Sequence, residues 1–81
     1  TMMEYLVTAG IGTRAIYRCK SQFDAICYAE MYADRHITNV FVRTNDGLLV
    51  FSIDVIDGKL YQTDYDAQQA EWEEFVEEEH G

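Results

Sequence analysis

The dipeptide Asp57-Gly58 lies between two segments rich in β-branched and aromatic residues, and it restricts the fold of this chain more than any other feature. These segments span residues 48–55 and 59–63. An Asp-Gly pair between such segments is a strong hairpin signal, because the central positions of a two-residue hairpin turn need positive φ. The pair therefore predicts two antiparallel strands.

Three further segments have the character of strands: residues 3–7, 14–19 and 37–44. In the second of them, Tyr17 and Cys19 alternate with Ile16 and Arg18, which is the period of a half-buried strand. Turns are expected at residues 10–12 and 45–47, where Gly and Asn-Asp-Gly occur. The chain therefore predicts a sheet of about four to five strands.

A helix is expected between the second and third of these strands, from Ser21 to about Arg35. Ser21 is a good N-cap, and Asp24 lies in the first turn, where a negative charge is favourable. Four apolar residues recur at i, i+3, i+4 and i+8: Phe23, Ile26, Cys27 and Met31. This spacing predicts an apolar stripe that faces the core and buries Cys27 as a small hydrophobic side chain.

A second helix is expected from Asp64 or Asp66 to about Glu79. One of its sides carries Tyr65, Gln68, Gln69, Trp72, Phe75 and Val76. We expect Trp72, with Phe75 and Val76, to anchor this helix to the sheet.

The order β-β-α-β-β-β-α predicts an α+β fold, an antiparallel sheet with two helices packed on one face. The strand order does not follow from the sequence. With 81 residues we expect a single domain over 1–81, with Thr1 an added residue before a native start at Met2.

Negative charge is concentrated in the final segment. Residues 61–81 hold eight Asp or Glu and no Lys or Arg, whereas residues 1–60 hold seven acids and six bases, for a net charge of -9. The acidic run consists of Glu71, Glu73, Glu74, Glu77, Glu78 and Glu79. On a helix it would carry roughly one charge per 2 Å, close to the roughly one per 1.7 Å of duplex DNA.

We therefore predict partner-binding residues on this segment and on the first helix. The set is Asp66, Glu71, Glu73, Glu74, Glu77 and Glu78, together with Tyr28 and Tyr32. Tyr28 and Tyr32 are four residues apart and suit an interface, because a tyrosine ring is large and rigid and has a polar tip. Two alternatives stay open: the acidic helix only keeps the protein in solution, and the tyrosines only cover the edge of the core.

The sequence offers little that supports catalysis or metal binding. Cys19 and Cys27 match no metal-ligand spacing, and His36 and His80 suggest no pairing with Ser21 or Ser52. Gly10-x-Gly12 lacks the third glycine of a dinucleotide fingerprint. We therefore expect no enzyme, no catalytic residue, no metal and no cofactor.

Composition also bears on location and partners. There is no apolar run near 18 residues, no secretory leader is expected, and two cysteines fit a reducing, cytoplasmic setting. The net charge of -9 argues against direct binding to nucleic acid or to anionic membranes.

A short, acidic α+β chain of this kind resembles the small inhibitors that phages and mobile elements use against host defence, the anti-CRISPR and antirestriction proteins. The resemblance rests on size, on the acidic run from Glu71 to Glu79 and on the strand-helix-strand frame from Ser21 to Val55. It implies a stoichiometric inhibitor in the host cytoplasm that mimics nucleic acid and binds a basic nucleic-acid-binding protein. The competing interpretation is a structural module that forms a homodimer through its tyrosine face or a sheet edge.

Overall fold

The computed structural model describes residues 3–65, which form a five-stranded antiparallel sheet and one α-helix. The elements are β1 (Tyr5–Ala9), β2 (Tyr17–Cys19), α1 (Gln22–His36), β3 (Val40–Thr44), β4 (Leu49–Ile56) and β5 (Lys59–Asp64). The strand order is β2-β1-β3-β4-β5, with every neighbouring pair antiparallel. The α+β class and the antiparallel sheet are therefore confirmed.

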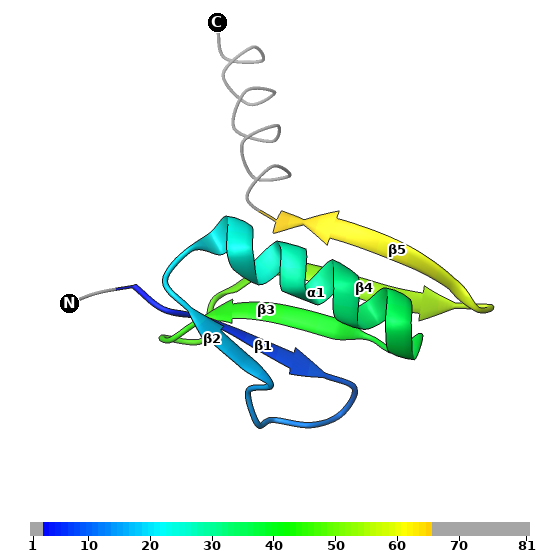
Figure 1. The fold of residues 1–81 in the computed structure, drawn as a ribbon, viewed down its shortest axis with the longest axis horizontal. Coiled ribbons are helices and arrows are strands. Elements are labelled where there is room, and N and C mark those ends of the chain that lie inside the picture. The colour runs from blue at the N-terminus through cyan, green and yellow to red at the C-terminus, as the bar shows by residue number, and fades with distance from the viewer. Residues whose placement is uncertain (1–2, 66–81) are drawn as a thin grey trace, which may run out of the picture.

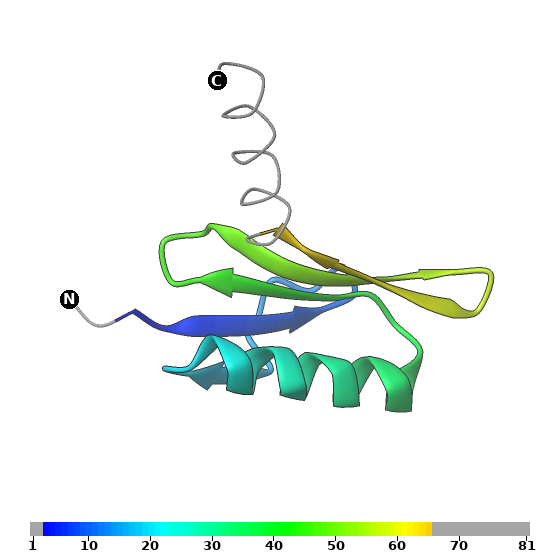
Figure 2. The same ribbon diagram turned by 90° about the horizontal axis from the view of Figure 1, so that it is seen from above.

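The helix α1 packs on one face of the sheet, as Figures 1 and 2 show. In the part of the chain that the structure describes, no helix lies on the opposite face, which we call the open face. The expected second helix, including Trp72, Phe75 and Val76, lies outside the described residues. Among residues 3–65, no helix has the length and apolar character needed to cross a membrane.

The beginning and the end of α1 follow from local chemistry. The Ser21 hydroxyl accepts a hydrogen bond from the Asp24 backbone N–H at 3.3 Å, which confirms Ser21 as the N-cap. The helix ends when Ile37 adopts a left-handed conformation with φ of 48°. The expected strand at 37–44 therefore begins only at Val40. The expected strand at 14–19 is likewise shorter and spans only β2.

The expected core stripe of α1 is wrong for Phe23, Cys27 and Met31, which are exposed, whereas Ile26 is half-buried and packs against the core. The fully buried residues of the helix are Ala25, Ala29 and Ala33, spaced four residues apart. Phe23 and Met31 are instead 74% and 51% exposed. Small side chains let the helix approach the sheet closely, so the larger residues of α1 lie along its flanks.

The core lies between α1 and the sheet. Among residues 3–65, it consists of the buried side chains Val7, Ala25, Ala29, Ala33, Val40, Val42, Val50, Phe51 and Ile53. The β3–β4 register shifts between Val42, which is opposite Phe51, and Arg43, which is opposite Leu49. Val50 is therefore an extra residue in β4, a β-bulge, and both Val50 and Phe51 reach the core.

The predicted hairpin is present between β4 and β5. Asp57 and Gly58 both have positive φ, at 54° and 76°, which matches the turn that fits the twist of a two-residue hairpin. Six residue pairs continue without a register shift from Ile56 opposite Lys59 to Phe51 opposite Asp64. The strand β5 is therefore fully paired along one edge.

Candidate functional site

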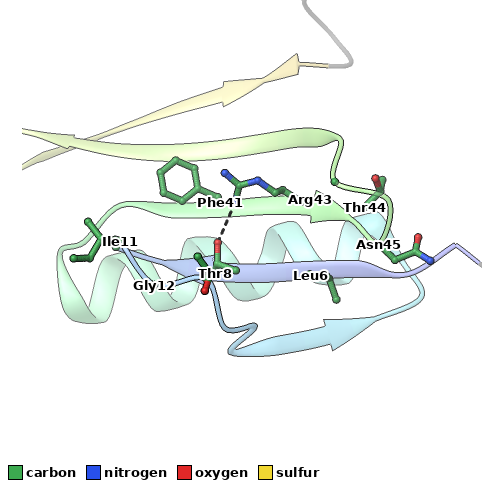
Figure 3. A pocket seen from close by; sticks show the side chains of 11 residues that line it. Leu6, Thr8, Ile11, Gly12, Phe41, Arg43, Thr44 and Asn45 are labelled. Atoms are coloured by element: carbon green, nitrogen blue, oxygen red, sulfur yellow. Dashed lines mark hydrogen bonds between the residues drawn. The ribbon is translucent and has the colours of Figure 1, made fainter.

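A pocket of about 380 Å³ lies on the open face, along β1 and β3. Figure 3 shows its side chains on the side of the sheet away from α1. The strands contribute Leu6, Thr8, Phe41, Arg43 and Thr44, and the loops at the two ends of the pocket contribute Gly10, Ile11, Gly12, Thr13, Asn45 and Gly47.

Arg43 is the charged group of this pocket. Its Nη1 donates a hydrogen bond to Thr8 Oγ1 at 3.2 Å, which the dashed line in Figure 3 marks. Its guanidinium carbon lies 5.1 Å from the centre of the Phe41 ring. A cation over an aromatic face is attracted by the ring's negative face. The guanidinium is therefore held by two independent contacts, both on the open face.

Strand geometry explains why these residues meet. Side chains alternate between the two faces of a strand, so Phe41 and Arg43 share one face while Val40 and Val42 face the core. Thr8 is directly opposite Phe41 in the β1–β3 pair. The bulge in β4 adds local twist at the position opposite Arg43.

Backbone conformation shapes both ends of the pocket. Gly10 has φ of 60° and donates its N–H to the Asn39 carbonyl at 2.7 Å, which holds the loop after β1 against the start of β3. At the other end, the Thr44 hydroxyl donates to the Asp46 carboxylate and accepts from the Leu48 N–H at 3.1 Å. Both ends are therefore tied to the sheet.

This pocket has the chemistry of a binding site for an oxygen-rich group. A guanidinium carries five N–H donors in a planar fork that suits carboxylates and phosphates, and Thr8 accepts from one of them. Leu6 and Ile11 supply apolar walls beside it. Within residues 3–65, no group of three His, Cys, Asp or Glu is placed to hold a metal ion.

Tyr28 and Tyr32, the predicted interface residues on the helix, belong to a column of stacked rings. The Tyr17 and Tyr28 rings are 4.3 Å apart and nearly parallel, at 6°. Tyr32 continues the column at 6.2 Å from Tyr28, and the His36 ring lies 4.2 Å from Tyr32. The column joins α1 to β2 and packs against the core. Both tyrosines stay half-buried, and their role in partner binding stays a prediction.

The other predicted site residues are Asp66, Glu71, Glu73, Glu74, Glu77 and Glu78, and they lie outside the described residues. The structure does describe the residue that leads into them. The Tyr65 hydroxyl lies 3.1 Å from the Ser52 hydroxyl, within hydrogen-bond distance. Ser52 is opposite Phe41 in register, so Tyr65 is attached to the open face. Tyr65, the last residue that the structure describes, is therefore held against the sheet.

A second depression lies between α1 and β5, on the helix side of the sheet. It is lined by Cys27, Glu30, Met31, Asp34, Leu60 and Gln62. Cys27 is exposed here, so the expectation that it is buried is wrong. Its neighbour Met31 belongs to the same wrongly assigned stripe. The surface between α1 and the outermost strand is therefore partly apolar and open to solvent.

The residues of the open-face pocket are absent from the site predicted from the sequence. The alternation of Phe41 and Arg43 is visible in the sequence and places both on one face. The proximity of Thr8 to these residues is not visible in the sequence, because it depends on the pairing of β1 with β3. These two strands are neighbours in the sheet but are separated along the chain by β2 and α1. Comparisons with protein-family models, curated proteins and solved structures found no match to this chain.

Proposed function

We propose that this chain is a non-catalytic binding protein, a stoichiometric inhibitor that occupies the nucleic-acid-binding groove of a basic partner with its acidic C-terminal segment. The division of charge carries the proposal. Eight acids and no base lie in residues 61–81, against seven acids and six bases in residues 1–60. A charge of one sign gathered in one segment fits a basic surface better than an evenly charged surface does.

The position of the acidic segment supports the same function. It follows β5 directly, and the Tyr65 hydroxyl is within hydrogen-bond distance of Ser52. Five residues separate Tyr65 from Glu71, the first residue of the acidic run. Attachment of Tyr65 to the sheet lowers the entropy lost when the residues that follow it bind a groove. An inhibitor of the anti-CRISPR or antirestriction type would use the segment in this way, in the cytoplasm of the host.

The acidic run is costly as a purely structural feature. If the segment is helical, Glu73 and Glu77 are like charges at i,i+4, and so are Glu74 and Glu78. Each such pair costs about 0.2–0.5 kcal/mol. No Lys or Arg in residues 61–81 offsets them. This cost is understandable if a basic partner supplies the missing positive charge.

Charge reversal tests the proposal. A basic protein captured from host lysate is purified, and its affinity for the wild-type chain is measured over a salt series. We expect steep weakening with salt and displacement by duplex DNA. Glu77→Lys with Glu78→Lys should weaken binding by about 1–3 kcal/mol per desolvated charge pair.

The matched control changes the same number of charges on α1, at Glu30→Lys and Asp34→Lys, both of which are exposed. It should retain most of the affinity. Equal binding by the wild type and by the Glu77 and Glu78 double variant across the salt series would rule out the proposed function.

The alternative is a homo-oligomerisation module in which the acidic residues only keep the protein in solution.

A further inference from the structure

Arg43 is a half-buried cation on the open face, and among residues 3–65 no carboxylate forms an ion pair with it. Its cross-strand neighbour Leu6 is opposite Arg43 in β3 and opposite Arg18 in β2. Arg18 is well exposed, and its Nη1 lies 3.8 Å from a carboxylate oxygen of Glu4. The more exposed arginine therefore has an anion within reach, whereas the guanidinium in the pocket has none.

Most hydrogen-bond donors of this guanidinium are unused. Within the described part of the chain, its one hydrogen bond is from Nη1 to Thr8 Oγ1 at 3.2 Å. A guanidinium has five N–H groups, so Nε and Nη2 keep their three N–H groups for a ligand. Thr8 is only 7% exposed, and its hydroxyl keeps its own O–H proton after it has accepted from Arg43. A planar edge of donors and one buried hydroxyl therefore lie beside the Phe41 ring.

The guanidinium lies toward the middle of the pocket. The backbone of Arg43 is opposite Leu6, but its side chain extends along the sheet to Thr8 and Phe41, the next residue pair on this face. Figure 3 shows the guanidinium between Ile11, at one end of the pocket, and Leu6, toward the other end. An anion bound to Arg43 therefore has an apolar side chain on either side of it.

We propose that the open-face pocket binds a small organic monocarboxylate, whose carboxylate pairs with Arg43 and whose apolar body contacts Leu6 or Ile11. Two parallel N–H···O bonds from Nε and Nη2 hold the carboxylate in the plane of the guanidinium. The pocket volume of about 380 Å³ is within the range of small-molecule sites. Thr8 and Phe41 fix the guanidinium before the ligand arrives, which lowers the entropy lost on binding. The inference goes beyond the proposed inhibitory function and does not depend on it.

The loops around the pocket favour a carboxylate over a phosphate. Phosphate sites commonly use free backbone N–H groups of a glycine-rich loop or of a helix N-terminus. Here the N–H groups of Gly10, Gly12 and Gly47 all donate to backbone carbonyls of the chain itself, at 2.7, 3.2 and 2.9 Å. Among the described residues that line the pocket, Arg43 is the one that carries a charge. A single cation balances the charge of a carboxylate but not that of a phosphate dianion.

The net negative charge of the chain does not extend to the part of the sequence that forms the pocket. The lining residues all fall within residues 6–47, which hold five bases and four acids, so this stretch is slightly positive. The acid nearest to Arg43 in sequence is Asp46, and its carboxylate already accepts a hydrogen bond from the Thr44 hydroxyl. The charge around Arg43 therefore favours a bound anion.

The experiment titrates the isotope-labelled full chain with small acids and follows the NMR signals of the Arg43 Nε–H and of the Thr8 and Phe41 amides. The probes are phenylacetate and hexanoate, and we expect at least one of them to bind with a dissociation constant of about 1 mM or below. Acetate has the charge without the apolar body, phenylacetamide has the body without the charge, and inorganic phosphate is the competing oxyanion. Each of these three should bind at least about tenfold more weakly than the better probe.

Substitutions of Arg43 separate its geometry from its charge. Arg43→Gln should lower the affinity for the better probe at least about tenfold, because the carboxylate loses its charged donors. Arg43→Lys should give an intermediate affinity, because an ammonium group keeps the charge but lacks the planar fork. The control Arg35→Gln removes an exposed cation from α1, on the other side of the sheet, and should bind like the wild type.

Thr8 is tested as a positioning residue by two variants. Thr8→Val removes the hydroxyl with little change of shape and should weaken binding of the probe, whereas Thr8→Ser keeps the hydroxyl and should restore the affinity. Thermal unfolding shows whether each variant is folded, and the comparison of acid with amide needs the wild type alone. The inference would be overturned by any of three results: no saturable shift with either probe up to about 20 mM, equal affinity for phenylacetamide or phosphate, or unchanged affinity in Arg43→Gln.

Discussion

The residues that hold α1 to the sheet are the smallest on the helix. Ala25, Ala29 and Ala33 are fully buried, and the half-buried Ile26, Tyr28 and Tyr32 flank them. An alanine stripe lowers the apolar area that the helix can bury but reduces its separation from the sheet. Protein interiors are packed closely enough that a single added methylene is felt. The fit between α1 and the sheet is therefore sensitive to side-chain size at these positions.

Enlarging the central alanine should destabilise the domain. Ala29→Leu adds volume at a fully buried position, and overpacking of this kind costs about 1–3 kcal/mol. Urea denaturation of the two proteins measures the difference in the free energy of unfolding. The control is Cys27→Leu, which adds apolar volume at an exposed position of the same helix and should change stability by less than about 0.5 kcal/mol. A larger loss in Cys27→Leu than in Ala29→Leu would contradict the observed orientation of α1.

At the scale of elements, the β4–β5 hairpin depends on its turn. Gly58 has φ of 76°, and a Cβ built there would meet no atom within 4 Å. The cost of Gly58→Ala is therefore the cost of a left-handed backbone for an L-residue, about 1–2 kcal/mol. Equilibrium unfolding measures it, with Asp57→Asn as the control because asparagine also tolerates positive φ. A stability of Gly58→Ala equal to that of the wild type would show that the turn has another conformation in solution.

The strands and turns are the part of the fold that the sequence predicts well. The Ser21 cap and the Asp57-Gly58 turn are local signals, and both are found where expected. All five expected strands are present, although β1, β2 and β3 each begin two or three residues later than expected. The face of α1 that packs on the core is not determined by a local signal in the sequence. Phe23 and Met31 are more hydrophobic than Ala25 and Ala29, yet the sheet accepts the smaller side chains. Which stripe is buried depends on the surface that the helix meets, and no helix pattern contains that information.

Two irregular features escape prediction for related reasons. Ile37 is β-branched and favours strands, but as the helix C-cap it adopts φ of 48°. The extra residue Val50 is fixed by the pairing between β3 and β4 and not by its neighbours in sequence. The open-face pocket depends on the same long-range pairing, since it joins Thr8 to Arg43. Its residue types were visible in the sequence, but their proximity was not.

For the molecule as a whole, the division of charge predicts that the protein does not bind nucleic acid directly. The nearest approach to a basic cluster is Arg14, Arg18 and Lys20 around β2, within a net charge of -9. The repulsion between this negative charge and the phosphates outweighs the favourable free energy of the few counterions that these cations could release. A gel shift with duplex DNA and RNA at about 100 mM salt should show no complex at micromolar protein. A shifted band under these conditions would instead direct attention to the β2 edge.

The position of β1 in the sheet has a consequence for how the chain reaches its folded state. Although β1 comes first in the sequence, it lies between β2 and β3, and the whole of α1 separates these two neighbours along the chain. One edge of β1 therefore stays unpaired during synthesis until residues 40–44 have been made. The contacts of β3 with β4 and of β4 with β5, by contrast, join strands that follow one another in the sequence. In refolding of the full chain, these contacts should form faster than the β1–β3 pairing, which must close a loop that contains β2 and α1.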